Sequence, residues 1–146
     1  MRKLSFCSFF LIMLIFICVP SYAEEGYVEI LRNDNLILSV NVGTVEYRNE
    51  KGYVIACSKW ISRGKSLIND KKVYGENFSH FLILGAFNPK YKHTHIISIV
   101  VYDKSRKILN SPTLFELTQW DEVIPNSTGE KLYDYVMAVY KNRRKK

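Results

Sequence analysis

The residues best suited to chemistry in this sequence are three histidines, His80, His93 and His95. His93 and His95 are two positions apart in a predicted strand, so both side chains project from the same face of the sheet. Imidazoles placed in this way could bind zinc or haem, or act as an acid and base pair. If the register of the predicted hairpin around Asn88 and Pro89 allows it, His80 lies opposite His93 and completes a three-histidine cluster. None of the three is adjacent in sequence to an Asp or Glu that would orient its ring, and a polar strand end is the alternative interpretation. We therefore expect no resident metal or cofactor.

Motifs of the common hydrolases are absent from the sequence. It contains no G-x-S-x-G turn, no H-E-x-x-H pair, no phosphate-binding glycine loop and no paired-carboxylate motif. A small secreted hydrolase of the ribonuclease kind could still use His80 and His93 together with a lysine. Two histidines and a lysine occur by chance in most proteins, so we expect a protein without enzymatic activity and keep the hydrolase as an alternative.

The positive charge of the chain is concentrated at its C-terminal end. Residues 24–146 carry 19 Lys or Arg and 14 Asp or Glu, and the last six positions hold five of the 19. The remaining 14 cations balance the 14 carboxylates, which excludes a nucleic-acid-binding face as the source of the high pI. The five cations of this basic tail, residues 141–146, are Lys141, Arg143, Arg144, Lys145 and Lys146. They could attach the protein to an anionic envelope or host-surface polymer or to anionic lipid, or they could form a solvated, frayed helix end.

The first 23 residues have the pattern of a cleaved signal peptide. A basic start precedes an apolar run at residues 7–19, and Pro20 then ends any helix. Small residues at Ser21 and Ala23 fit the site of a signal peptidase, which predicts cleavage between Ala23 and Glu24. The apolar run is shorter than the roughly 20 residues that span a bilayer, and no later stretch of the mature chain is long enough. We expect an exported protein of the periplasm, the cell surface or the extracellular space.

Removal of the signal peptide would also remove two of the three cysteines. Cys7 and Cys18 lie in the apolar run, so the mature chain keeps Cys57 alone and cannot form an internal disulfide. Cys57 alternates in phase with Tyr53 and Ile55 in a predicted strand, which favours a small apolar core residue.

The mature chain reads as a series of short strands followed by one helix. Strands are predicted at residues 27–31, 36–40, 44–48, 53–61, 77–87, 93–102 and 108–111. Residues 96–101 are apolar on both faces, which predicts a strand covered on both sides. Residues 62–75 are polar with two glycines and should form the main loop, whereas residues 114–123 add an edge strand or an irregular crossing.

The final helix has the clearest local signals. Ser127 and Glu130 fit a capping box, in which the Ser127 hydroxyl accepts from the amide of residue 130 and the Glu130 carboxylate accepts from the amide of Ser127. Pro125 stands just upstream, where the chain is not yet helical. The helix should run over residues 128–142, and an apolar stripe at helical spacing should pack on the sheet. The members of the stripe are Leu132, Tyr133, Val136, Met137 and Tyr140.

Residues 27–140 resemble the surface-adhesin protein E-like family of small exported bacterial proteins. The resemblance rests on "IISIVVYDKSRKILNS", on Trp120, and on "VIPNSTGEKLYDYV" at residues 123–136. It implies an antiparallel sheet of about six strands with the C-terminal helix packed on one face, and it implies that Trp120 packs under the helix N-terminus. Some members tie the helix to the sheet with a disulfide, but the corresponding positions here, near Asn88 and Val139, are not cysteine. Apolar packing should then hold the helix alone.

Together these observations predict an exported α+β protein with a single domain at residues 24–140. Its expected role is non-catalytic, as a binding or envelope-associated protein, which the resemblance makes adhesin-like. The first alternative is a metal- or haem-binding periplasmic protein that uses His80, His93 and His95, and the second is the small secreted hydrolase.

Overall fold

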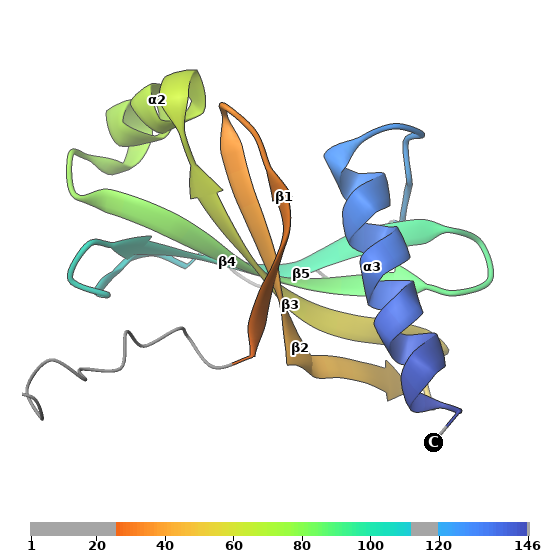
Figure 1. The fold of residues 1–146 in the computed structure, drawn as a ribbon. Coiled ribbons are helices and arrows are strands. Elements are labelled where there is room, and N and C mark those ends of the chain that lie inside the picture. Colours follow the sequence, from red (N-terminus) through yellow and green to blue (C-terminus); the bar gives the residue numbers. More distant parts are fainter. Residues whose placement is uncertain (1–25, 112–119, 146) are drawn as a thin grey trace, which may run out of the picture.

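The computed structural model describes residues 26–111 and 120–145, which fold into one antiparallel sheet with two helices, as expected for the α+β class (Figure 1). The predicted signal peptide, its cleavage site at Ala23 and Glu24, and most of the predicted edge strand at 114–123 lie outside the described residues. The strands are β1 (Tyr27–Arg32), β2 (Leu36–Arg48), β3 (Tyr53–Ser62), β4 (Phe78–Asn88), β5 (His93–Asp103), β6 (Ile108–Asn110) and β7 (Asp121–Glu122). The helices are α2 (Gly64–Tyr74) and α3 (Thr128–Arg143).

The strands follow one another in the sheet in the order of the chain, from β1 to β6, and β7 pairs with β5 on the far side. In two of the tight turns between strands, an asparagine side chain hydrogen-bonds to the backbone. The Asn33 amide oxygen accepts hydrogen bonds from the backbone amides of Asn35 and Leu36, both at 2.9 Å. Asn88 does the same for Lys90 and Tyr91 at 2.9 and 3.2 Å. Such Asx turns stabilise the predicted hairpins locally.

Helix α3 packs across one face of the sheet and closes the hydrophobic core. Its buried residues are Leu132, Tyr133, Val136 and Met137, which are four of the five predicted members of the stripe; the fifth, Tyr140, is half-buried against the core. Across the contact the sheet supplies Leu38, Val40 and Val54, all with no exposed surface. Burial of such side chains contributes about 1.5–3 kcal/mol each, whereas a lone helix of this length is marginal. The sheet therefore supplies most of the stability of α3.

The second helix, α2, replaces the loop that we predicted at residues 62–75. Helix α2 buries no residue completely, so its sequence lacks the apolar stripe from which a helix can be predicted. Its N-cap residue, Arg63, makes no side-chain capping bond. Tertiary contacts hold the helix instead: the Ser62 hydroxyl hydrogen-bonds to Asp70, and the Tyr74 ring stacks on Phe78 with centroids 5.8 Å apart.

Strand β2 joins two segments that we predicted as separate strands. Its register against β3 shifts between Asn41 and Glu46, so that residues 42–45 of β2 lie opposite Ala56 alone. We refer to residues 42–45 as the β2 bulge. The Thr44 hydroxyl donates to the Asn41 carbonyl and accepts from the Cys57 amide, both at 2.8 Å. The hydroxyl thus satisfies backbone groups that the bulge removes from the ladder.

Two burial predictions for the strands are wrong. Strand β5 is not covered on both sides, because only His95 and Val101 are buried and Ile96 is 42% exposed. Cys57 is half-buried on the sheet face that α3 does not cover, with its sulfur 3.4 Å from the Tyr27 hydroxyl. It is the only cysteine of the described residues.

Candidate functional site

The hairpin of β4 and β5 separates His80 from the other two histidines. His80 pairs with Tyr102, whereas Asn88 is the partner of His93 and Ala86 is the partner of His95. The expected pairing of His80 with His93 is therefore wrong. Six residues separate position 80 from position 86 on β4, which is about 20 Å along a strand. No single metal ion or haem iron can bind all three imidazoles.

Each histidine sits in surroundings of its own. His80 is buried, stacks on the Tyr102 ring with centroids 5.2 Å apart, and has its Nδ1 3.0 Å from the Ser79 hydroxyl. His93 and His95 share a face, as predicted, with His95 buried beside Trp120 at a centroid distance of 6.1 Å. Within residues 26–111 and 120–145, no group of three or more His, Cys, Asp or Glu is placed to hold a metal ion.

Trp120 packs on the opposite side of the sheet from the one we expected. Its ring meets Tyr53 edge to face with centroids 5.7 Å apart. Val54 faces α3, so Tyr53, the next residue in β3, points to the other face. The prediction that Trp120 packs under the helix N-terminus is wrong, and the residue instead covers part of the face that α3 leaves open.

The cap of α3 forms with one change from the prediction. The Ser127 hydroxyl accepts from the Glu130 amide at 3.1 Å, as expected. The Glu130 carboxylate accepts from the Asn126 amide at 2.7 Å instead of from Ser127. Asn126 has a φ of 60°, and this left-handed residue turns its amide toward the carboxylate. Pro125 lies in the turn before the helix, where we placed it.

Glu130 also joins the helix to the β4–β5 turn. Its carboxylate accepts from Lys92 Nζ at 2.6 Å. The hydrogen bond from Lys92, followed by the one from the Asn126 amide, lowers the pKa of Glu130, and the same ion pair raises the pKa of Lys92. Apolar packing is therefore not the only force that holds α3 to the sheet.

A hydrogen bond links α3 to β4 near the position where the resemblance places a disulfide in other proteins. The Tyr133 hydroxyl donates to the Asn88 carbonyl at 2.8 Å. Burial raises the pKa of the Tyr133 hydroxyl, so the group stays a donor at ordinary pH.

The predicted basic tail is largely part of the fold. Lys141 and Arg143 belong to α3, and the Arg143 guanidinium donates to the Val45 and Val42 carbonyls of the β2 bulge at 2.6 and 2.9 Å. Arg144 donates to the Tyr140 hydroxyl at 3.1 Å. Lys145 is exposed, and Lys146 lies outside the described residues. The interpretation of residues 141–146 as five free charges is wrong for Arg143, which has a structural role.

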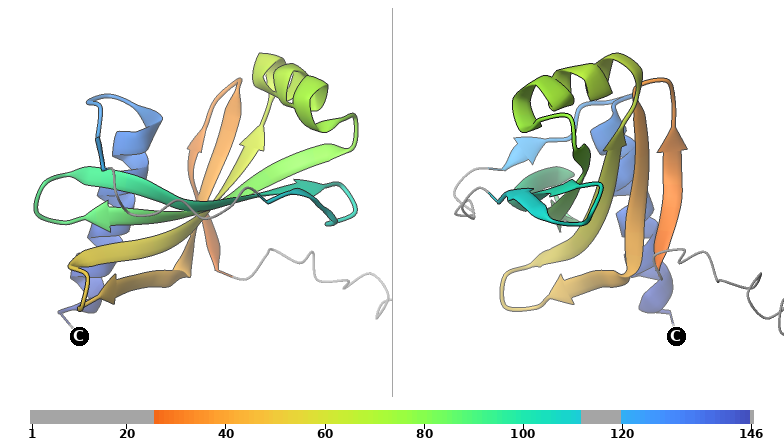
Figure 2. Two further views of the ribbon diagram at one scale, coloured as in Figure 1. Left: turned by 180° about the vertical axis from the view of Figure 1, so that it is seen from behind. Right: turned by 90° about the vertical axis from the view of Figure 1, so that its left-hand side faces the viewer.

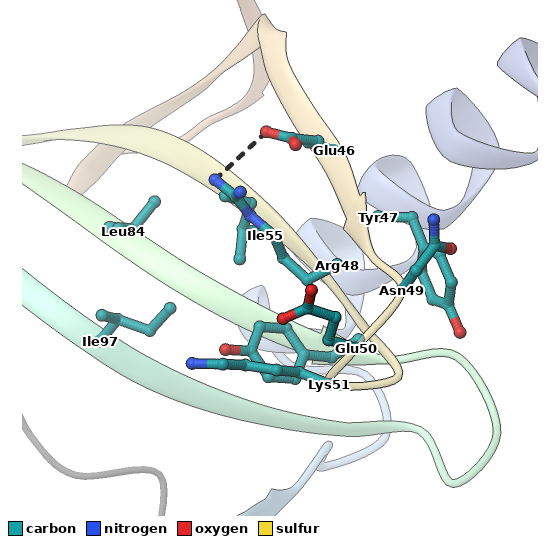
Figure 3. Close-up of a pocket in the computed structure, with 10 residues that line it drawn as sticks. Glu46, Tyr47, Arg48, Asn49, Glu50, Lys51, Ile55, Leu84 and Ile97 are labelled. Carbon is teal, nitrogen blue, oxygen red and sulfur yellow. Dashed lines mark ion pairs between the residues drawn. The ribbon is translucent and has the colours of Figure 1, made fainter.

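A groove of about 510 Å³ lies beside the β2–β3 turn. Its apolar side chains come from three neighbouring strands, with Ile55 on β3, Leu84 on β4 and Ile97 on β5 (Figure 3). Ile55 alternates with the core residues Val54 and Ala56, so the groove opens on the face that α3 does not cover. We call this cavity the sheet groove; its further lining residues are Glu46, Tyr47, Arg48, Asn49, Glu50, Lys51 and Tyr53.

Charged side chains of both signs line one side of the sheet groove. Arg48 pairs with Glu46 at 3.3 Å, and both side chains are at least half exposed (Figure 3). Glu50 and Lys51 follow in the exposed turn, which closes on Gly52 at a φ of 72°. Such an arrangement can hold a molecule that combines an apolar body with a charged group. Sequence reasoning missed it because the three apolar residues meet only through strand pairing.

The local register of β5 places Ile97 at the sheet groove. Gly85 pairs with Ile96 and Leu84 with Ser98, so Ile97 is an extra residue in a bulge. A side chain at Gly85 would stand 3.1 Å from the Phe87 ring, which packs over this position on the α3 side. The glycine thus leaves room for the Phe87 ring in the core.

Comparison with known proteins adds no relative to this picture: neither a family model nor a curated protein matches the chain. The resemblance to the surface-adhesin protein E-like family stays a prediction. Among the described residues, neither helix has the length and apolar character that a membrane crossing demands.

Proposed function

We propose that the protein is an exported, non-catalytic binding protein that holds an anionic, partly apolar ligand in the sheet groove. The ligand class that suits the groove is an acylated or aromatic segment of an envelope or host-surface polymer. The observation that carries the proposal is that apolar and cationic side chains line one open cavity. The apolar residues are Ile55, Leu84 and Ile97, and the cations are Arg48 and Lys51.

The dimensions and chemistry of the sheet groove support binding. Its volume of about 510 Å³ falls in the range of about 300–1,000 Å³ that small-molecule sites occupy. The apolar side chains of the groove contribute affinity but do not orient a ligand, because the hydrophobic effect is non-directional. Arg48 at the rim can fix the position of an anionic group. The Arg48–Glu46 pair is exposed and worth little in water, so a ligand anion can displace Glu46 from Arg48 at small cost.

A pair of matched probes tests this chemistry. 1-Anilinonaphthalene-8-sulfonate combines an aromatic body with one anionic group, and N-phenyl-1-naphthylamine has the same body without the charge. In the chain from residue 24 onward, NMR titration should shift the methyl signals of Ile55 and Ile97. The sulfonate should bind more tightly than the neutral probe, and the methyl signals of Ile68 and Ile108, at the other end of the sheet, should stay in place.

Two variants make the test specific. Arg48→Glu should weaken sulfonate binding about tenfold and leave the neutral probe unaffected, because only the charged contact is lost. Lys131→Glu, on the exposed side of α3, is the matched control and should change neither affinity. Shifts at Ile68 instead of Ile55, or equal effects of the two variants, would show that the sheet groove is not the site.

A further inference from the structure

The outer face of α2 carries lysines and apolar side chains together. Its exposed residues include Lys65 and Lys72, which lie one above the other, and Ile68 and Val73, which flank the two lysines on either side about 140° apart. Ile68 is 56% exposed and Val73 is 71% exposed, the highest value among the large apolar side chains of the described residues. The outside of α2 therefore combines positive charge with apolar surface.

The β5–β6 turn adds three more cations at the same end of the sheet. Lys104, Arg106 and Lys107 are exposed, and the Lys104 amide donates to the Asn77 carbonyl, just after α2, at 3.0 Å. Both segments lie toward the viewer in the right-hand panel of Figure 2, at the end of the molecule remote from α3. We call these three cations and the four exposed α2 residues the α2 platform.

The cations of the α2 platform form no direct ion pairs with described residues, although Lys107 lies near the Asp103 carboxylate. None of its five cations forms an ion pair within residues 26–111 and 120–145. Three carboxylates lie nearby: Asp70 accepts from the Ser62 hydroxyl, and Glu76 pairs with Lys71 at 3.1 Å. Asp103 accepts from the Ser105 and Lys107 amides, both at 2.8 Å.

From this arrangement we infer that the α2 platform docks the protein on an anionic lipid bilayer. The five cations face the lipid phosphates, and the Ile68 and Val73 side chains enter the boundary between headgroups and acyl chains. The two apolar residues distinguish a bilayer from a soluble polyanion, because only a bilayer offers them an apolar medium beside the negative charge. Docking of this kind leaves the sheet groove free, so it goes beyond the proposed ligand binding.

Vesicle binding tests the inference directly. The chain from residue 24 onward should cosediment with vesicles of equal parts phosphatidylglycerol and phosphatidylcholine and should not bind vesicles of phosphatidylcholine alone. Binding should weaken as the salt concentration rises. The double variant K72E/K107E should bind at least tenfold more weakly, because basic residues near an anionic surface contribute separately.

The apolar half of the platform needs its own variant. I68S/V73S keeps every charge and should lower vesicle affinity at least about threefold, with unchanged binding to soluble heparin. Ile124→Ser is the matched control, since Ile124 is 70% exposed but lies outside the platform, and it should bind like the parent. Circular dichroism before each titration confirms that every variant is folded.

Three results would overturn the inference. The first is an absence of binding to the anionic vesicles, and the second is undiminished binding by I68S/V73S, which would identify a simple polyanion site. The third is full loss of binding in R144E/K145E with K72E/K107E unaffected, which would assign the contact to the C-terminal end of α3.

Discussion

Arg143 in α3 and Val45 in β2 are joined by a hydrogen bond of 2.6 Å although they are 98 residues apart in the chain. The same guanidinium reaches the Val42 carbonyl, so one side chain serves two carbonyls of the β2 bulge. A bulge leaves backbone groups without partners in the ladder, and here an arginine from the far end of the domain supplies them. Arg143, which the sequence placed among the tail charges, therefore links α3 to the β2 bulge; we call this pair of hydrogen bonds the Arg143 clamp.

Replacement of Arg143 should therefore cost stability. Arg143→Met keeps the aliphatic stem and removes the donors, and we expect a loss of about 1–2 kcal/mol in the free energy of unfolding, measured in urea. Arg143→Lys should fall between parent and Met, because an ammonium cannot reproduce the planar fork. Lys145→Met is the control and should stay within about 0.5 kcal/mol. An equal effect of both Met variants would refute the clamp.

Contact of α3 with the sheet can be tested by one buried and one exposed position on the same helix. Val136 has no exposed surface, whereas Ala138 faces solvent. Val136→Asp should destabilise the protein by at least about 3 kcal/mol, since it buries a charge without a partner. Ala138→Asp should cost about 1 kcal/mol or less, chiefly through helix propensity. Similar midpoints of thermal unfolding for the two variants would contradict the packing of α3.

The Glu130–Lys92 pair should make stability depend on acid pH. The pKa of Glu130 is lower in the folded state than its ordinary value of 4.5. A group of this kind stabilises the fold above its unfolded pKa, and that stabilisation is lost as the pH falls through the folded pKa. Glu130→Gln should therefore be less stable at pH 7, and its stability should fall less steeply from about pH 5 to pH 3. Glu122→Gln, an exposed carboxylate without an ion pair in the described residues, should leave the curve unchanged.

Export can be checked by the mass of the protein that leaves the bacterial cytoplasm. Cleavage between Ala23 and Glu24 predicts a mature chain that begins at Glu24. Ala23→Arg should block processing, because the peptidase reads a small residue there, whereas Tyr22→Gln at the unread position should be processed normally. Recovery of the full-length parent chain outside the cytoplasm would contradict the prediction.

The parts of the fold that sequence predicted well are those with local signals. Ser127 and Glu130 mark the start of α3 because a cap is made within one turn, and Val136 follows from helical spacing. Helix α2 has no such mark, because it buries no side chain completely and Arg63 provides no cap. Its Ile68 and Val73 looked like ordinary loop residues until the helix placed them on either side of Lys65 and Lys72.

The candidate sites depended on contacts between distant segments, and these were harder to predict. A hairpin pairs residues at equal distances from its turn, so a turn at Asn88 places His80 opposite Val101, far from His93. The extra residue at Ile97 then moves the partner of His80 to Tyr102. The position of the histidines in their strands does not by itself give this register. The sheet groove requires the bulge at Ile97, and the partner of Arg143 requires the β2 bulge; neither follows from spacing along one segment.

The order of the strands has a consequence for how the molecule is assembled. Strands β1 to β3 follow one another through short turns, and so do β4 to β6, whereas α2 lies between β3 and β4. Helix α3, in contrast, makes long-range contacts: Arg143 hydrogen-bonds to Val42 in β2, about a hundred residues earlier in the chain. Until α3 packs on the sheet, Leu38, Val40 and Val54 lack the cover that it provides, so the hydrophobic core is complete only once the last element is in place.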